Sequence, residues 1–153
     1  LIDIHEYLVK QGVKTDAVDG VQYIYHEPCH TPLKHHGSAS AISSLLGKES
    51  VESAQCCGEA GTLAVASPAI AGKIRARKEE EMEKAKAQLV TDEPAKILTS
   101  CPSCLQGLSR LEGETGVEAD YIVIELARQL KGEDWQRDFV KEVKNGGIER
   151  VLM

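Results

Sequence analysis

The chain has 153 residues, enough for one domain with its own hydrophobic core. Its formal net charge is -6 and only 4% of its residues are aromatic, so it lacks the cationic and stacking side chains that a nucleic-acid partner requires. No apolar run approaches the roughly 20 residues of a membrane span, and none is predicted.

The first predicted element is a helix over residues 3–12. No strand precedes it for it to pack on, and the chain begins at Leu1 rather than at a methionine. We therefore interpret residues 1–20 as the terminal helix and linker of a preceding unit in a longer protein.

Two short strands follow, each running into a loop with cysteine. Residues 21–25 are rich in β-branched and aromatic side chains and lead to Cys29, which indicates a strand and its exit loop. A small-residue helix closed by Gly47 and a weak strand over residues 50–54 come next. The adjacent pair Cys56-Cys57 follows that second strand directly.

A long helix is predicted from Ser67-Pro68, which carries cap and first-turn signals, to about Leu89. Its charge run over residues 73–86 is typical of a solvated helix face, and no function is assigned to it. The side chains expected to face inward are those of Ile70, Ile74, Met82 and Leu89.

The next strand covers residues 95–99, and Cys101-Pro102-Ser103-Cys104 opens a helix after it. A further short strand at residues 117–119 precedes a helix that Asp120 caps and Gly132 ends. Apolar side chains predict a last helix before Gly146-Gly147: Trp135, Phe139, Val140 and Val143.

Strands that alternate with helices predict an α/β fold, a mainly parallel sheet with helices on both faces. The predicted units are a cysteine-rich domain over residues 21–132 and a C-terminal helix and tail over residues 133–153. Binding sites in such sheets lie beyond the carboxyl ends of the strands. All the cysteine loops are expected at that edge.

The chain has five cysteines, an odd number and too few for a secreted disulfide scaffold. A reducing compartment fits this usage, so we expect a cytoplasmic protein, either free or held at the inner face of the membrane by its partners. Clustered cysteines in that setting are metal ligands or redox catalysts. The five candidates are Cys29, Cys56, Cys57, Cys101 and Cys104.

The spacing of the cysteines suits a metal or a dithiol. Cys101 and Cys104 lie one helical turn apart at a helix start, where free N–H groups and the helix dipole favour thiolate. Cys56 and Cys57 can serve one site only if the backbone bends, and Gly58 and Gly61 can supply that bend.

Two histidines flank Cys29 in the sequence. His26 and His30 could ligate zinc or donate hydrogen bonds to sulfur, although surface or loop-packing histidines are the commoner outcome. Together with Gly58 and Gly61 they are the residues expected around the ligands.

Three ordered blocks carry a resemblance to a known family. His26-Glu27-Pro28-Cys29-His30, Cys56-Cys57-Gly58-Glu59-Ala60-Gly61 and Cys101-Pro102-Ser103-Cys104 resemble the motifs of the cysteine-rich CCG domain. That family includes the cysteine-rich subunit of heterodisulfide reductase and the iron-sulfur subunit of glycolate oxidase, and the resemblance covers residues 21–131. Residues 120–153 resemble the end of long flavin-dependent 2-hydroxyacid dehydrogenases.

The resemblance implies a noncubane 4Fe-4S cluster held by all five cysteines. It also implies an electron-transfer module of a flavin-containing oxidoreductase that oxidises a 2-hydroxy acid such as lactate or glycolate. The expected partners are a domain or subunit carrying FAD and a second cysteine-rich unit, and the isolated domain is not expected to be catalytic alone.

Two other functions remain open from the residues themselves. The first is a zinc-binding structural or interaction domain, since zinc is the main alternative metal and could substitute in the site. The second is a thiol-disulfide oxidoreductase using Cys101 and Cys104. Only the cluster hypothesis employs every cysteine.

Overall fold

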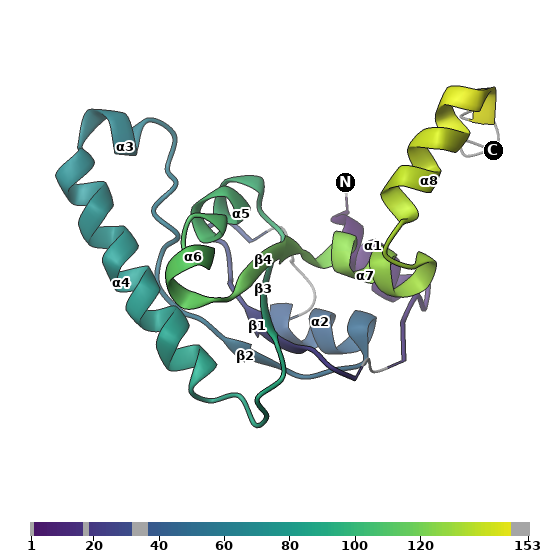
Figure 1. Cartoon of the computed structure of the whole chain (residues 1–153), viewed down its shortest axis with the longest axis horizontal. Helices are drawn as coiled ribbons and strands as arrows, with labels where there is room; N and C mark the ends of the chain where they lie inside the picture. The colour runs from purple at the N-terminus through teal and green to yellow at the C-terminus, as the bar shows by residue number, and fades with distance from the viewer. Residues whose placement is uncertain (1, 17–18, 32–36, 148–153) are drawn as a thin grey trace.

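The strands form one four-stranded parallel sheet in a computed structural model that describes residues 2–16, 19–31 and 37–147. Their spatial order is β2-β1-β3-β4 (Figure 1). Ile24 at the centre lies opposite Val51 on one side and Ile97 on the other. The α/β fold with an all-parallel sheet is therefore confirmed. The strands are β1 (Gln22–Tyr25), β2 (Ser50–Glu52), β3 (Ala95–Thr99) and β4 (Glu118–Tyr121).

One face of the sheet is covered by α4 (Pro68–Lys86), α5 (Pro102–Ser109) and α6 (Glu112–Thr115) (Figure 1). Its core contains Ile24 and Ile97 from the central strands. From the helices and the loops, this core adds the buried side chains of Met82, Leu108, Leu111 and Val117, together with Cys57 and Cys104. Two of the five cysteines are thus part of a hydrophobic core.

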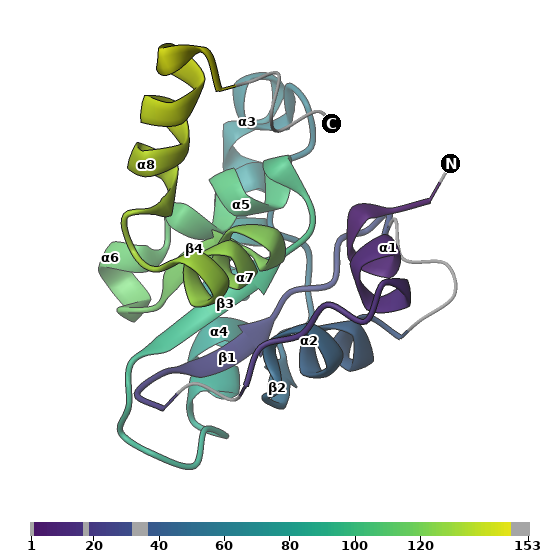
Figure 2. The ribbon, with the colours of Figure 1, turned by 90° about the vertical axis from the view of Figure 1, so that its right-hand side faces the viewer.

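The opposite face is covered by α1 (Ile4–Lys10), α2 (Ser38–Leu46) and α7 (Ile122–Lys131) (Figure 2). Side chains alternate along β1, so Tyr23 and Tyr25 point to this face while Ile24 points to the other. The helices complete this core with Ile42, Leu45, Leu46, Ile122 and Leu126. The expected cover of helices on both faces is confirmed.

The connections after β1 and β3 run to opposite faces of the sheet. The chain leaves β1 toward α2 on one face, whereas it leaves β3 toward α5 on the other. In open parallel sheets, adjacent strands whose exit loops diverge in this way create a ligand crevice at their carboxyl ends. The loops after these two strands carry Cys29 and the Cys101-Cys104 pair.

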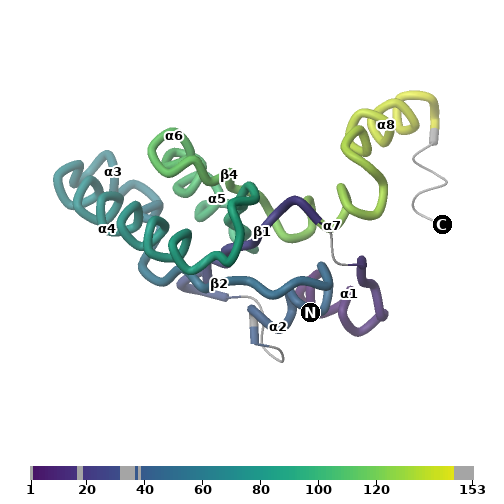
Figure 3. The backbone as a smooth tube through the Cα atoms, turned by 60° about the horizontal axis from the view of Figure 1, so that its bottom comes forward, coloured from purple at the N-terminus to yellow at the C-terminus, as the bar shows by residue number. Residues whose placement is uncertain are grey.

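The C-terminal helix α8 (Trp135–Glu142) extends away from the sheet and continues into η1 (Val143–Gly147) (Figures 2 and 3). None of the side chains of α8 is buried, and Phe139 and Val140 are about half exposed. The short helix α3 (Leu63–Ala66) precedes α4. None of the helices in the described ranges is long and apolar enough to cross a membrane.

The long helix α4 differs from its prediction in its buried face and its ends. Ile70 is 55% exposed, so the expectation that it faces inward is wrong. Ser67 precedes the helix but its side chain makes no capping hydrogen bond, and α4 ends at Lys86. The residues that α4 buries recur at heptad-like spacing: Ala71, Lys78, Met82 and Ala85.

The last strand and helix are displaced slightly from their prediction. Asp120 lies within β4, and Tyr121 occupies the cap position of α7. The Asp120 carboxylate accepts a hydrogen bond from the Tyr121 backbone N–H and forms an ion pair with Arg128 of α7, 2.9 Å away. Asp120 therefore anchors the start of α7 from inside the strand.

Candidate metal centre

Three loops bring the five cysteines to the carboxyl edge of the sheet. Cys29 follows β1, Cys56-Cys57 follows β2, and the pair Cys101 and Cys104 follows β3. These are three neighbouring strands in the order β2-β1-β3. The expected placement of the cysteine loops at the strand ends is what the structure shows.

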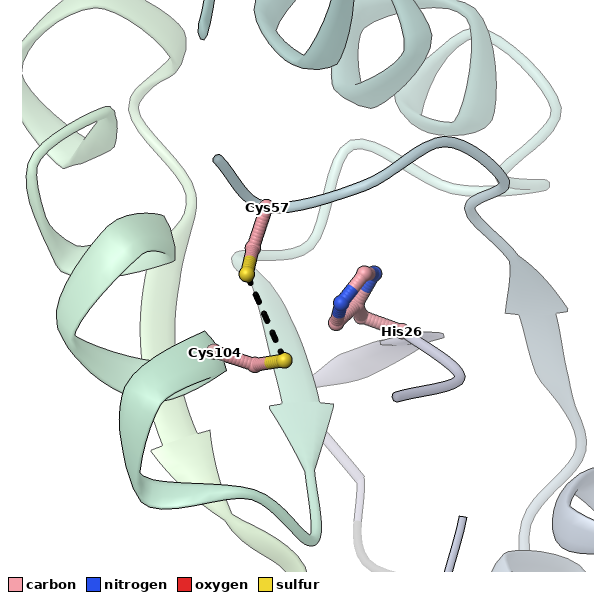
Figure 4. Close-up of side chains that lie close together, drawn as sticks. All are labelled: His26, Cys57 and Cys104. Atoms are coloured by element: carbon pink, nitrogen blue, oxygen red, sulfur yellow. Dashed lines mark hydrogen bonds between the residues drawn. The ribbon is translucent and has the colours of Figure 1, made fainter. Parts of the chain in front are cut away.

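Four of the sulfurs form two close pairs, each between two loops. Cys57 Sγ is 3.4 Å from Cys104 Sγ, and both side chains are buried, with 5% and 4% of their surface exposed (Figure 4). At the outer side, Cys29 Sγ lies 4.0 Å from Cys56 Sγ, and Cys29 is exposed. All five thiols are free. The site therefore runs from a buried sulfur pair to a pair that solvent reaches.

A left-handed turn lets Cys56 and Cys57 serve the same region. Gly58 has φ of 82°, a conformation that glycine adopts without steric cost, and its N–H donates to Cys56 Sγ over 3.4 Å. Gly61 is also left-handed, with φ of 53°. The backbone bend expected of these glycines is confirmed, whereas the left-handed Gln55 before them was not predicted.

Gly107 permits the close approach of the Cys57 loop to α5. A Cβ atom at position 107 would lie 2.8 Å from the Cys57 carbonyl oxygen and 2.7 Å from Glu59 Cγ. The same loop is tied to the end of α5 by an ion pair between Glu59 and Arg110. Sequence reasoning missed Gly107, because nothing local distinguishes a glycine inside a helix that contacts a distant loop.

The start of α5 presents the CxxC pair. Cys101 is the cap residue, Pro102 occupies the first turn, and Cys104 lies within the helix. The Cys101 backbone N–H donates to Thr99 Oγ1 over 3.4 Å, which orients the turn out of β3. The predicted proline-led helix start is confirmed.

His26 belongs to the buried part of the site. Its side chain is 1% exposed, and its backbone N–H donates to the Leu98 carbonyl, so the end of β1 is held against β3. A ring nitrogen of His26 and the sulfurs of Cys57 and Cys104 all lie within 4.8 Å of one another. These three residues form a candidate metal-binding cluster. His30, by contrast, is exposed.

The site also contains a buried lysine that the sequence did not suggest. Lys78 of α4 is fully buried, and its ammonium lies 3.0 Å from His26 Nδ1. It donates to the carbonyl of Ser53 at 3.1 Å, to Ser53 Oγ at 2.8 Å and to the carbonyl of Ala54 at 2.8 Å. The interpretation of the charge run over residues 73–86 as a solvated helix face is therefore wrong at Lys78.

The electrostatics of the site favour thiolate at one member of the inner pair. The hydrogen bond with Cys104 lowers the pKa of Cys57 against the effect of burial, and His26 acts in the same direction. The same contact, with burial, raises the pKa of Cys104. The contact between the two sulfurs therefore favours negative charge on Cys57 over negative charge on Cys104.

The pKa values of three neighbouring side chains are also shifted. Burial lowers the pKa of Lys78 to about 8, opposed by the cysteines, so its amine remains protonated at neutral pH. Burial also raises the pKa of Cys56, although the Gly58 N–H donor acts in the opposite direction. Burial and the nearby thiols of Cys101 and Cys104 raise the pKa of Tyr121.

The fold is α/β, and the loops at the ends of its parallel strands carry the cysteines. These features define a cysteine-rich domain with a candidate metal site. Its family follows from the sequence comparisons. The model of the CCG cysteine-rich domain matches residues 23–109, more than half of the chain, and the chain belongs to this family. This match covers all five cysteines, His26, Lys78 and Gly107.

The C-terminal part of the chain matches a second family model. Residues 109–153, which include α6, β4, α7 and α8, match a domain of unknown function (DUF3400). Searches of the curated proteins and of the solved structures gave no significant match.

Proposed function

We propose that this chain is an iron-sulfur redox module in which Cys29, Cys56, Cys57, Cys101 and Cys104 hold a 4Fe-4S cluster of the noncubane type. The single observation that carries the proposal is the convergence of the cysteine loops of three neighbouring strands at one sheet edge, with sulfur–sulfur contacts of 3.4 Å and 4.0 Å between loops. A cluster bound there would supply one-electron transfer.

The residues at the site fit such a group. Thiolates are the usual ligands of iron-sulfur clusters, and an ordinary cubane needs four of them. Five cysteines on flanking loops supply one more, which suits a cluster with a bridging thiolate. The N–H donor of Gly58 and the ammonium of Lys78 offset negative charge that thiolates bring to the site.

The exposure of the two sulfur pairs supports an electron-transfer role. Cys57 and Cys104 anchor the inner side in a hydrophobic core, where the protein controls the surroundings of the metal. Cys29 lies exposed at the outer side, so this is the side from which an electron partner would approach. The proposed partners are a flavin-containing domain or subunit, carrying FAD, and a second cysteine-rich unit.

We further propose, from the family relationship, that the complete oxidoreductase oxidises a 2-hydroxy acid such as lactate or glycolate. The flavin would accept the electrons from the substrate, and this module would take them onward.

A zinc site is the second candidate, and one observation favours it. His26, Cys57 and Cys104 alone place three donor atoms within 4.8 Å, which is a plausible start for a tetrahedral zinc site. This cluster of donor atoms does not include Cys29, Cys56 or Cys101. The cluster proposal accounts for them.

A dithiol enzyme that uses Cys101 and Cys104 has less support. The thiol whose pKa is lowered is Cys57, and Cys104 makes its 3.4 Å contact with Cys57, from another loop. A dithiol catalyst instead requires an activated nucleophile within the CxxC pair.

The deciding experiment is anaerobic reconstitution of the chain with iron and sulfide, with zinc offered in parallel. We expect about four irons and four sulfides per chain, with a cluster signal in electron paramagnetic resonance. Stoichiometric zinc with no uptake of iron would refute the cluster and establish the zinc site.

A further inference from the structure

The surroundings of Lys78 define which atoms hold protons. Four polar atoms surround its amine: the carbonyl oxygens of Ser53 and Ala54, Ser53 Oγ, and His26 Nδ1. The two carbonyl oxygens can only accept hydrogen bonds, so they occupy two N–H bonds of the ammonium. One N–H bond remains for the side toward His26 and Ser53 Oγ.

The contact with His26 restricts the imidazole. An ammonium has no lone pair and cannot accept a hydrogen bond, so Nδ1 of His26 can meet it favourably only as an acceptor. A neutral imidazole with an unprotonated Nδ1 carries its proton on Nε2. The Ser53 hydroxyl can rotate to donate or accept, so it is compatible with this arrangement.

The other nitrogen of His26 faces the sulfurs. One ring nitrogen points toward Cys57 and Cys104 and the other points away from them (Figure 4). Nδ1 is engaged with Lys78, and Nε2 is buried without a hydrogen-bond partner among the residues that the structure describes. A buried N–H group without a partner is unfavourable, and the Cys57 and Cys104 sulfurs, which lie within 4.8 Å of a ring nitrogen of His26, can accept its hydrogen bond.

We propose that Lys78 is a positioning residue for His26: it holds the imidazole as the Nε2–H tautomer, so that His26 donates a hydrogen bond to the Cys57 and Cys104 sulfurs and does not ligate the metal. The Lys78 ammonium and the Nε2–H group of His26 together place positive charge and a hydrogen-bond donor beside the inner sulfurs.

This assignment has a consequence for the bound group. A metal ligand must offer a lone pair, so an Nε2–H imidazole cannot serve as the third ligand of a zinc ion. Hydrogen bonds to cluster sulfur instead raise the reduction potential by stabilising the more negative, reduced state. In this respect the inference rests on the proposed cluster, whereas the tautomer itself does not.

The tautomer can be measured without any metal. In a long-range proton–nitrogen correlation spectrum of the reduced apo chain at pH 7, we expect His26 to show an unprotonated Nδ1 and a protonated Nε2. The signals are assigned by their loss in His26→Gln. A protonated Nδ1 in the wild-type chain would overturn the inference.

Substitution of Lys78 provides a second test of the tautomer assignment. Lys78→Met should shift the His26 nitrogen signals toward a mixture of tautomers, whereas Lys73→Met, an exposed lysine on the same helix, should leave them unchanged. Lys78→Gln keeps an N–H donor without the charge and serves if the Met variant does not fold. Unchanged His26 signals in a folded Lys78→Met chain, or a mixture of tautomers in a folded Lys78→Gln chain, would refute the positioning role.

The reconstituted chain separates this inference from the proposed function. Lys78→Met and His26→Gln should retain the iron and sulfide content of the wild type but have lower midpoint potentials, with non-additive effects in the double variant. Loss of iron specifically in His26→Gln would show ligation and overturn the inference. A wild-type chain that takes up no iron would refute the cluster while leaving the tautomer result to stand by itself.

Discussion

The approach of α5 to the Cys57 loop makes Gly107→Ala a sharp test of the site geometry. The new Cβ would lie 2.8 Å from the Cys57 carbonyl oxygen and 3.3 Å from Cys57 Cβ. The first contact is with backbone, which cannot swing aside as a flexible side chain does. We therefore expect the loop to move away from α5, at a cost of about 1–3 kcal/mol in unfolding free energy.

The displacement should be visible in two assays. Thermal unfolding should shift downward by ~2–4 °C for each kcal/mol, and binding of iron or zinc should weaken because Cys57 withdraws from Cys104. Gly72→Ala on α4 is the matched control, since its Cβ meets nothing within 4 Å, and it should be neutral or stabilising by about 0.5–1 kcal/mol. A Gly107→Ala chain with wild-type stability and metal content would refute the close approach.

Three further predictions concern ligands, folding and pH. Cys56→Ser and Cys57→Ser should each abolish or reshape the cluster spectrum, and a variant with unchanged iron content and spectrum would exclude the five-thiolate ligand set. Chelation should leave the circular dichroism spectrum helical, because both faces of the sheet have apolar cores, and a coil spectrum would make the metal part of the fold. Burial alone would raise the pKa of Glu125, but hydrogen bonds from Gln129, Lys96 and Tyr23 outweigh burial, so the pKa is lowered. The contribution of Glu125 to stability is therefore present above the unfolded-state pKa of roughly 4.3. It is lost as the pH falls through the lower folded-state pKa. Glu125→Gln should cost about 1–3 kcal/mol at pH 7 and reduce the acid dependence measured by urea unfolding, whereas Glu142→Gln, at an exposed position, should change neither.

The fold could be predicted because its local signals agree with one another. The apolar strands at residues 21–25 and 95–99 lie at the centre of the sheet, and buried parallel strands are usually apolar on both faces. The convergence of the cysteines followed from the same rule, since parallel strands expose their carboxyl ends at one edge. Sequence alone could therefore indicate the region of the site.

The surroundings of the site could not be predicted because they depend on contacts across the chain. Lys78 belongs to a strongly charged segment, and only its spacing of four from Met82 and seven from Ala71 and Ala85 places it on the buried stripe of α4. What makes its burial tolerable is a set of acceptors at Ser53 and Ala54, more than twenty residues earlier. The same stripe explains why Ile70 turns outward.

The charges around the sulfurs bear on which group the site can hold. A buried ammonium beside thiolates is favourable only when the site as a whole remains negative, because burying an uncompensated charge is costly. Two thiolates neutralise one zinc ion, so the inner zinc site would leave Lys78 buried next to a neutral centre. Four or five thiolates around an iron-sulfur core leave a net negative charge that Lys78 can offset. The buried lysine therefore favours the cluster over zinc. Removal of its charge in Lys78→Met should shift metal selectivity toward zinc. The measurement is a competition in which the chain is reconstituted with iron and sulfide in the presence of zinc. Equal selectivity in the wild type and in Lys78→Met would show that the lysine charge does not discriminate between the two.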